Sequence, residues 1–246
     1  MLRQRARGPE WLDADDLSPD VVHQTFDMLP TVNRWFGGVR PVLSFFRRES
    51  RGWVPGQVVR VLDIGCGIGD VGIALVRWAR RAGHRLQIHG IDRHPLIVEL
   101  ARENCKAYPE IEITCTDVLT LEARPGGQPY DYVHASQVLH HFPDGEVVPL
   151  LRHMLSLCER QVVINDLLRD PLAYAATWAF GLLAPPAFRH DSRISVRRGF
   201  RRDELARLLR EGGLPRFSLT EHFFYRFLLI LDKQQSGCHA ERKQSL

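Results

Sequence analysis

The sequence predicts an α/β fold with a mostly parallel β-sheet and a helical N-terminal extension. From residue 58 onward, short β-branched runs alternate with helical patterns, which is typical of a sheet covered by helices on both faces. Near the end of the chain, SLTEHFF and YRFLLILD follow each other with almost nothing between them, which indicates an antiparallel pair. We therefore expect a helical extension or lid over 1–56, one α/β domain over 57–232 and a disordered tail over 233–246.

The extension opens with a clear helix start. Ser18 can cap a helix whose first position is Pro19, since proline fits the first turn and a serine hydroxyl accepts from its free N–H groups. Residues 31–50 indicate one or two more helices, interrupted near Gly37 and Pro41.

The elements of the α/β domain follow in a regular order. Strands are expected at 58–65, 85–92, 111–119, 130–136, 161–168, 218–224 and 225–232. Helices are expected at 69–83, 94–108, 147–158 and 201–213. The uncharged segment 171–188 is shorter than the roughly 20 apolar residues of a membrane span and is broken by Pro185 and Pro186. It therefore predicts a buried or pocket-lining helix.

The composition is that of an ordinary globular protein. The chain has 246 residues, of which 44% are hydrophobic and 25% charged, and its net charge is +4, too small to argue for nucleic acid. The 5 cysteines form no CxxC pair and no zinc spacing, so we expect buried free thiols in a reducing compartment. The basic N-terminal residues precede no apolar run, so no secretory signal is expected, and we predict a cytoplasmic location.

The stretch VLDIGCGIGD, residues 61–70, is the main functional signal. Gly65, Gly67 and Gly69 lie between a strand and a helix, where glycine lets the backbone approach a ligand and the helix offers free N–H groups. The GxGxG spacing differs from the GxGxxG of dinucleotide-binding enzymes, which argues against a dinucleotide site. No GK[ST] follows, so the turn is not a phosphate-binding P-loop. The carboxylate of Asp63, just before the turn, would repel a pyrophosphate but attract an ammonium group.

Two further acids end the next strands. Asp92 can accept both hydroxyls of a ribose, and Asp117 can accept the exocyclic amine of an adenine. An ammonium, a ribose and an adenine in strand order describe S-adenosylmethionine (SAM). The alternative is that these acids only cap a turn and a helix.

At this point the chain resembles a known family. VLDIGCGIGD, IHGIDRHP, CTDVLTL and DYVHASQVLHHFPD, within residues 56–232, are similar to successive motifs of the class I SAM-dependent methyltransferases. The resemblance implies a Rossmann-like sheet of seven strands with the last strand antiparallel. It also implies SAM as cofactor. The methionine end would be held by Asp63, Gly65, Cys66, Gly67 and Gly69, and the ribose by Asp92 and Arg93. The adenine would lie at Asp117 and Val118, and Ser136 and Gln137 would close the site.

Methylation of a phenol benefits from a base, because a phenol has a pKa of about 10. His140 and His141 in VLHHFPD are the candidate catalytic residues, and His190 with Asp191 is a second candidate pair. No metal is expected. The metal-assisted catechol subclass has an Asp–Asn pair after strand five, whereas this chain has Asn165 and Asp166 in reverse order, and Ser136 and Gln137 stand where another acid is needed. The Asn/Asp-Pro-Pro-Tyr signature of amine methylation on bases is also missing.

The substrate signal is indirect. The extension and the insert are rich in aromatic residues, and such additions cover the ligand-binding ends of the strands in this fold. We expect a hydrophobic small molecule such as a phenol, quinol or polyketide, contacted by Trp178, His190 and Arg193. NRWFGG and RHDSRISVRRGF also resemble a bacterial subgroup associated with type III polyketide synthases, which implies an alkylresorcinol-like substrate. Transfer to oxygen is favoured, but C-methylation of a lipid quinone is not separated from it.

Other classes stay open. The arginines of residues 193–202 could contact phosphates of RNA, in an RNA-modifying enzyme, or lipid headgroups, in a peripheral membrane enzyme. Nucleic acid is the less favoured partner of the two. A SAM-binding regulatory protein without turnover is a third alternative, and the oligomeric state is not indicated.

Overall fold

The computed structural model describes residues 2–14, 16–28, 38–122, 129–182, 184–214, 216–223 and 225–233. Of the one or two helices predicted over residues 31–50, the part before residue 38 lies outside this described part, as does the tail beyond residue 233.

One seven-stranded sheet forms the centre of the domain, in the order β3-β2-β1-β4-β5-β7-β6. Its strands are β1 (Val58–Ile64), β2 (Arg85–Asp92), β3 (Ile111–Cys115), β4 (Tyr130–Ser136), β5 (Cys158–Leu167), β6 (Phe217–His222) and β7 (Arg226–Asp232). β7 pairs antiparallel with both β5 and β6, and the other pairs are parallel. The predicted α/β fold with an antiparallel last strand is therefore confirmed.

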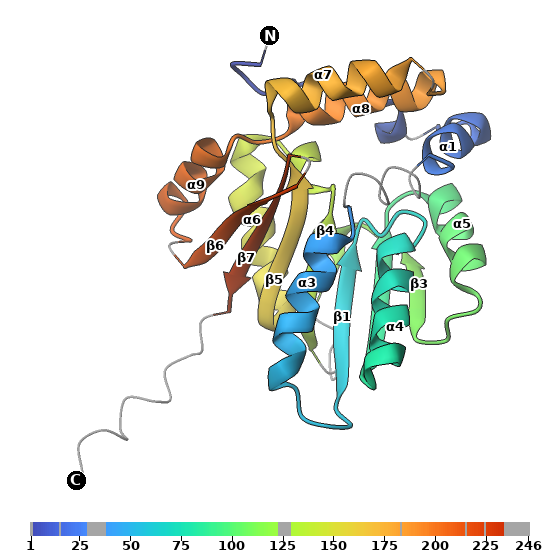
Figure 1. The fold of residues 1–246 in the computed structure, drawn as a ribbon, viewed down its shortest axis with the longest axis vertical. Coiled ribbons are helices and arrows are strands. Elements are labelled where there is room, and N and C mark those ends of the chain that lie inside the picture. Colours follow the sequence, from blue (N-terminus) through green and yellow to red (C-terminus); the bar gives the residue numbers. More distant parts are fainter. Residues whose placement is uncertain are drawn as a thin grey trace.

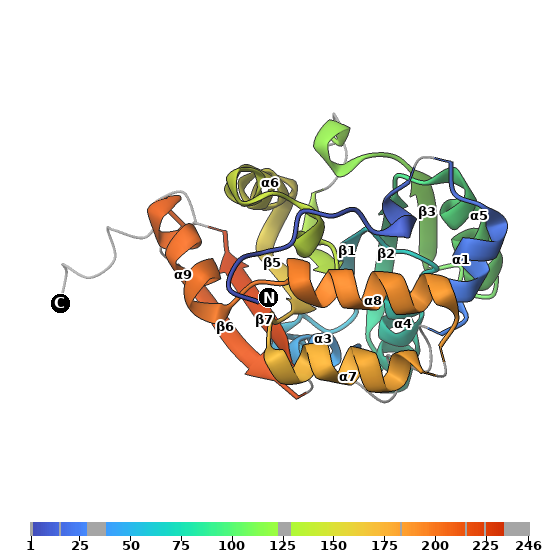
Figure 2. The ribbon, with the colours of Figure 1, turned by 90° about the horizontal axis from the view of Figure 1, so that it is seen from above.

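Helices cover both faces of this sheet, with α6 on one side and α3 and α4 on the other (Figure 2). The α-helices are α1 (Pro19–Phe26), α3 (Arg40–Glu49), α4 (Asp70–Ala82), α5 (Pro95–Cys105), α6 (Asp144–Leu157), α7 (Pro171–Gly181), α8 (Pro186–Arg198) and α9 (Arg202–Glu211). Short 3-10 turns are η1 (Trp11–Asp13), η2 (Ser50–Gly52), η3 (Val118–Thr120) and η4 (Leu139–His141). Ser18 caps α1 as expected, since its Oγ accepts a hydrogen bond from the N–H of Val21. Pro41 does not interrupt a helix; it lies in the first turn of α3, where its missing N–H is tolerated.

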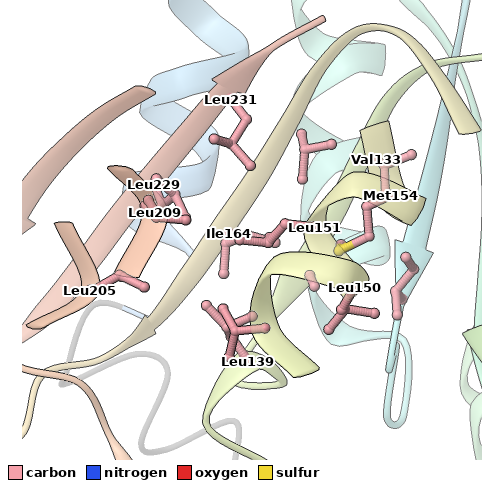
Figure 3. Close-up of a cluster of buried hydrophobic side chains, with 14 of the residues drawn as sticks. Val133, Leu139, Leu150, Leu151, Met154, Ile164, Leu205, Leu209, Leu229 and Leu231 are labelled. Atoms are coloured by element: carbon pink, nitrogen blue, oxygen red, sulfur yellow. The ribbon is translucent and has the colours of Figure 1, made fainter. Parts of the chain in front are cut away.

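The apolar core has one part on each face of the sheet. One part packs α6 and α9 against the central strands and includes Leu151, Met154 and Leu209 (Figure 3). The other packs α3 and α4 against the opposite face. Phe45 and Phe46 are fully buried in this second part. They therefore belong to the core, whereas the aromatic residues of the extension were expected, as a group, over the ligand-binding ends of the strands.

The uncharged insert forms two helices rather than one. Pro186 starts α8, and α7 and α8 run side by side across one end of the sheet (Figures 1 and 2). Of the two alternatives predicted for this segment, α7 is the pocket-lining helix, since Ala173 and Ala176 line the cavity. It is not a buried helix, because Leu172, Trp178 and Phe180 are at least half exposed. In the described part of the chain, no helix combines the length and the apolarity needed to cross a membrane.

Candidate active site

The glycine turn follows β1, where the strand order changes direction between β2 and β4. Such a switch point opens a crevice at the carboxyl ends of the strands. Gly65 and Gly67 have φ values of 61° and 53°, which favour glycine. A Cβ on Gly65 would lie 2.5 Å from Cγ2 of Val138, so this close approach also requires glycine.

Gly69 has a different role from the one expected. It is not among the residues that line the cavity above the turn. Its φ is 79°, and a Cβ there would lie 2.4 Å from Sγ of Cys105. The third glycine therefore allows the start of α4 to pack against α5, instead of bordering the ligand space.

A cavity of about 1040 Å³ opens above the turn, between the strand ends and the segments α1, α7 and α8. It brings together most of the site residues expected from the sequence. These are Asp63, Gly65, Cys66, Gly67, Asp92, Arg93, Asp117, Val118, Ser136, Gln137, His140 and His141.

The two acids at the first strand ends are fixed by hydrogen bonds. Oδ1 of Asp63 lies 2.8 Å from Nδ1 of the buried His134, which stands opposite it in the β1–β4 register. Oδ2 of Asp92 accepts from the N–H of Gly67 at 3.2 Å, and Oδ1 accepts from the N–H of His94 at 3.1 Å. Burial raises the pKa of Asp92, although these N–H donors oppose the change.

Three other expected residues around the turn have simple local contacts. Oδ1 of Asp117 accepts from the N–H of Leu119 at 2.8 Å and so caps η3, while the residue also borders the cavity. Nη2 of Arg93 donates to the carbonyl of Asp13 at 2.9 Å. Burial raises the pKa of Cys66, so its thiol stays neutral.

His140 lies between two carboxylates. Its Nδ1 is 2.7 Å from Oδ1 of Asp166, and its Nε2 is 3.3 Å from Oε1 of Glu10. Burial lowers the pKa of His140, but Asp166 and Glu10 outweigh this and raise it to about 9. Both carboxylates therefore favour the protonated form of this imidazole.

His141 has its own carboxylate partner. Its Nδ1 is 2.7 Å from Oδ1 of Asp13, and its ring centre is 4.3 Å from that of His140. Asp13 also pairs with Arg198. Burial raises the pKa of Asp13, but His141 and Arg198 together bring it well below its usual range.

Glu10 and Asp13 were not identified from the sequence. They reach the histidines across more than a hundred residues, and no local pattern marks them. One ligand atom from each of Glu10, His140 and His141 lies within 4.8 Å of the others, a group able to hold a metal ion. The residues weighed for a catechol-type site are engaged elsewhere: Nδ2 of Asn165 donates to Oγ of Ser136 at 2.8 Å, and Asp166 holds His140.

The expected substrate contacts lie outside the cavity. Trp178 is half exposed, and the guanidinium of Arg193 stacks 3.5 Å above its ring. His190 pairs with Asp191 and stacks on Trp11. The side of α8 that lines the cavity carries Asp191, Ser192, Ser195, Val196 and Arg198.

Arg226 is a further cavity residue that the sequence did not reveal. It is fully buried within the apolar run of β7, and its Nε and Nη1 have no hydrogen-bond partner among the described residues. Burial lowers its pKa to about 10, while Asp166 and Asp70 act to raise it. Such a group is suited to an anionic part of a ligand.

Comparison with known proteins agrees with this geometry. Residues 61–161 match the profile of a family described as "Methyltransferase domain". These residues therefore carry a methyltransferase-like domain, similar to the class I SAM-dependent methyltransferases. No curated protein sequence matches it, so its relatives are recognised from solved structures.

The chain is similar in fold to three solved proteins. Magnesium protoporphyrin IX methyltransferase from Synechocystis, solved with bound S-adenosylhomocysteine (SAH), has a TM-score of 0.55 and 22% identity over 87% of this chain and 84% of that chain. The CMeT domain of the citrinin polyketide synthase has a TM-score of 0.63 and 12% identity, over 91% of this chain and 59% of that chain. A SAM-dependent methyltransferase from Aquifex aeolicus has a TM-score of 0.57 and 16% identity, over 89% of this chain and 100% of that chain. The chain thus spans about three fifths of the length of the second protein.

The cavity residues fit SAM, the cofactor of this methyltransferase class. The glycines leave room for close contact with the backbone, Asp63 offers a carboxylate to an ammonium, and the buried Asp92 offers oxygens to a ribose. The cavity volume of about 1040 Å³ lies at the upper end of the range of small-molecule pockets.

Proposed function

We propose that the enzyme transfers a methyl group from SAM to an oxygen of a hydrophobic small molecule, a phenol, quinol or polyketide. The cavity carries this proposal, because one space of about 1040 Å³ joins the cofactor residues to an apolar wall and to the two histidines. Ala173, Ala176 and Phe180 of α7 contribute to that wall.

In this proposal Asp63 and the turn from Gly65 to Gly67 hold the methionine end of SAM. Asp92 and Arg93 lie at the ribose, Asp117 and Val118 at the adenine, and Ser136 and Gln137 close the site. Arg226 adds a positive charge that can take a carboxylate of the cofactor or of the substrate.

SAM supplies a sulfonium that is already a reactive methyl donor. The protein therefore has to align the acceptor oxygen and exclude water, which can supply a large part of the rate. The acceptor must also lose its proton, and His140 and His141 are the groups we assign to assist this loss. Transfer forms the O–CH₃ bond and breaks the S–CH₃ bond, whose electron pair stays on sulfur.

A small molecule is favoured over RNA by the arginine contacts. Arg198 pairs with Asp13 and Glu10, Arg193 stacks on Trp178, and Nη2 of Arg201 donates to the carbonyl of Leu2. Arg193 and Arg198 are thus engaged within the protein, whereas Arg201 and Arg202 are exposed. Transfer to carbon in a lipid quinone stays the alternative, since both reactions can start from the same deprotonated phenol. An alkylresorcinol-like phenol is the acceptor we favour.

The test is transfer from radiolabelled SAM into a bacterial extract rich in phenolic lipids, separated into organic-soluble, protein and RNA fractions. Label in the organic fraction supports the proposal, and the labelled compound then reports whether oxygen or carbon was methylated. Label in RNA or protein would contradict it.

A further inference from the structure

Two histidines and one glutamate converge on the cavity wall. We infer that Glu10, His140 and His141 form a binding site for a divalent transition-metal ion such as Zn²⁺ or Co²⁺, which faces the acceptor. This inference deepens the proposed function and rests on it for the role of the ion, but not for the binding itself.

The distances suit an ion. Nε2 of His140 lies 3.3 Å from Oε1 of Glu10, and two ligands at about 2.1 Å from a tetrahedral Zn²⁺ are about 3.4 Å apart. One ligand atom of His141 completes the group within 4.8 Å.

Each imidazole is also oriented as a metal ligand would be. Nδ1 of His140 is held by Asp166 and Nδ1 of His141 by Asp13. Histidine ligands in metal sites usually have their second nitrogen bonded to a carboxylate or carbonyl, which fixes the ring. This leaves Nε2 of both rings for an ion, and the buried Nε2 of His140 faces Oε1 of Glu10 at 3.3 Å.

Charged groups of both signs surround the two rings. Three of them are the carboxylates Glu10, Asp13 and Asp166, and Arg198 pairs with the first two. Arg5 and the buried Arg226 are further cations that act on Asp166. The mixed nitrogen and oxygen set suits Zn²⁺ or Co²⁺ better than Mg²⁺, which prefers oxygen ligands.

Three protein ligands leave a coordination position for the acceptor oxygen, because all three residues border the cavity. An ion there would stabilise the deprotonated oxygen, and the released proton would pass to water. The histidines would then assist proton loss as ligands rather than as free bases.

The test is titration of the full-length protein, stripped of metal and free of any histidine tag, with Zn²⁺ in a calorimeter and with Co²⁺ in a spectrometer. We expect one ion per chain and a Co²⁺ spectrum of low coordination number. Glu10→Gln and His141→Ala should weaken Zn²⁺ binding at least tenfold, and Asp13→Asn and Asp166→Asn about ten- to a hundredfold. His190→Ala is the matched control, because His190 also pairs with an acid but lies outside the group.

Equal Zn²⁺ affinity in the wild type, Glu10→Gln and His141→Ala would overturn the inference, as would no binding to the wild type. Methyl transfer without metal binding would leave the proposed function standing while the metal site falls. Metal binding without methyl transfer into any fraction would leave the metal site standing while the proposed function falls.

Discussion

Asp63 and His134 form a buried pair across neighbouring strands, with Oδ1 of the acid 2.8 Å from Nδ1 of the imidazole. The acid is the last polar residue before the glycine turn, so His134 positions the carboxylate that we assign to the cofactor ammonium. Its effect on the cofactor is indirect, because it acts through Asp63.

His134→Ala should lower SAM affinity about tenfold or more, since an unpartnered buried group costs about 1–3 kcal/mol. His134→Asn should recover much of the affinity, because its amide N–H can take the place of Nδ1. Calorimetric titration with SAM measures both variants, with exposed His23→Ala as control. Wild-type affinity in His134→Ala would show that the pair does not position the acid.

Asp92→Asn should weaken SAM binding at least tenfold. The amide retains the size of the side chain but replaces one acceptor oxygen by a donor, and both oxygens of Asp92 already accept N–H groups. Asp203→Asn, an exposed acid on α9, is the control. Unchanged SAM affinity in calorimetry would remove Asp92 from the ribose.

Gly69→Ala and Gly56→Ala separate backbone strain from steric clash. Both glycines have φ of 79°, but nothing lies within 4 Å of a Cβ on Gly56, whereas Cys105 blocks the one on Gly69. We expect about 1–2 kcal/mol of destabilisation at Gly56 and about 1–3 kcal/mol more at Gly69. Urea unfolding measures this, and adding Cys105→Ala should restore only the second part. Equal losses for the two glycines would disprove the packing role.

Arg226→Met should leave the ligand-free protein as stable as the wild type or more so, because it removes a fully buried charge whose Nε and Nη1 have no hydrogen-bond partner among the described residues. The same change should reduce the rise in melting temperature that SAM or an acidic substrate produces. Exposed Arg207→Met is the control. A fall of several degrees in the ligand-free protein would mean that Arg226 supports the fold instead.

The fold could be predicted because its signals are local. The bounds of β1, β2 and β4 differ little from the expected ones, and the glycines mark the turn by themselves. Pro185 and Pro186 were seen to break the insert, but not to start a second helix. Phe45 and Phe46 show the limit of composition, since aromatic residues suit a core as well as a lid.

The site was only partly predictable. The acids at strand ends could be placed, because parallel strands bring their carboxyl ends to one edge. Glu10, Asp13 and Arg226 could not, because their roles depend on contacts far apart in the chain. Trp178, His190 and Arg193 were placed at the substrate by residue type, whereas the rotation of α7 and α8 decides which side chains face inward.

The contacts of residues 5–13 have a consequence for synthesis on the ribosome. Ser195 donates to Glu10 across 185 positions, and Arg198 pairs with Asp13 over the same separation. Most of the sheet can form while the chain is still emerging, but the early segment has no final partner until α8 has left the exit tunnel. Cofactor residues can thus be in place on a nascent chain well before the histidines have both of their acids. A stalled or truncated product that lacks α8 would therefore not complete the reaction centre.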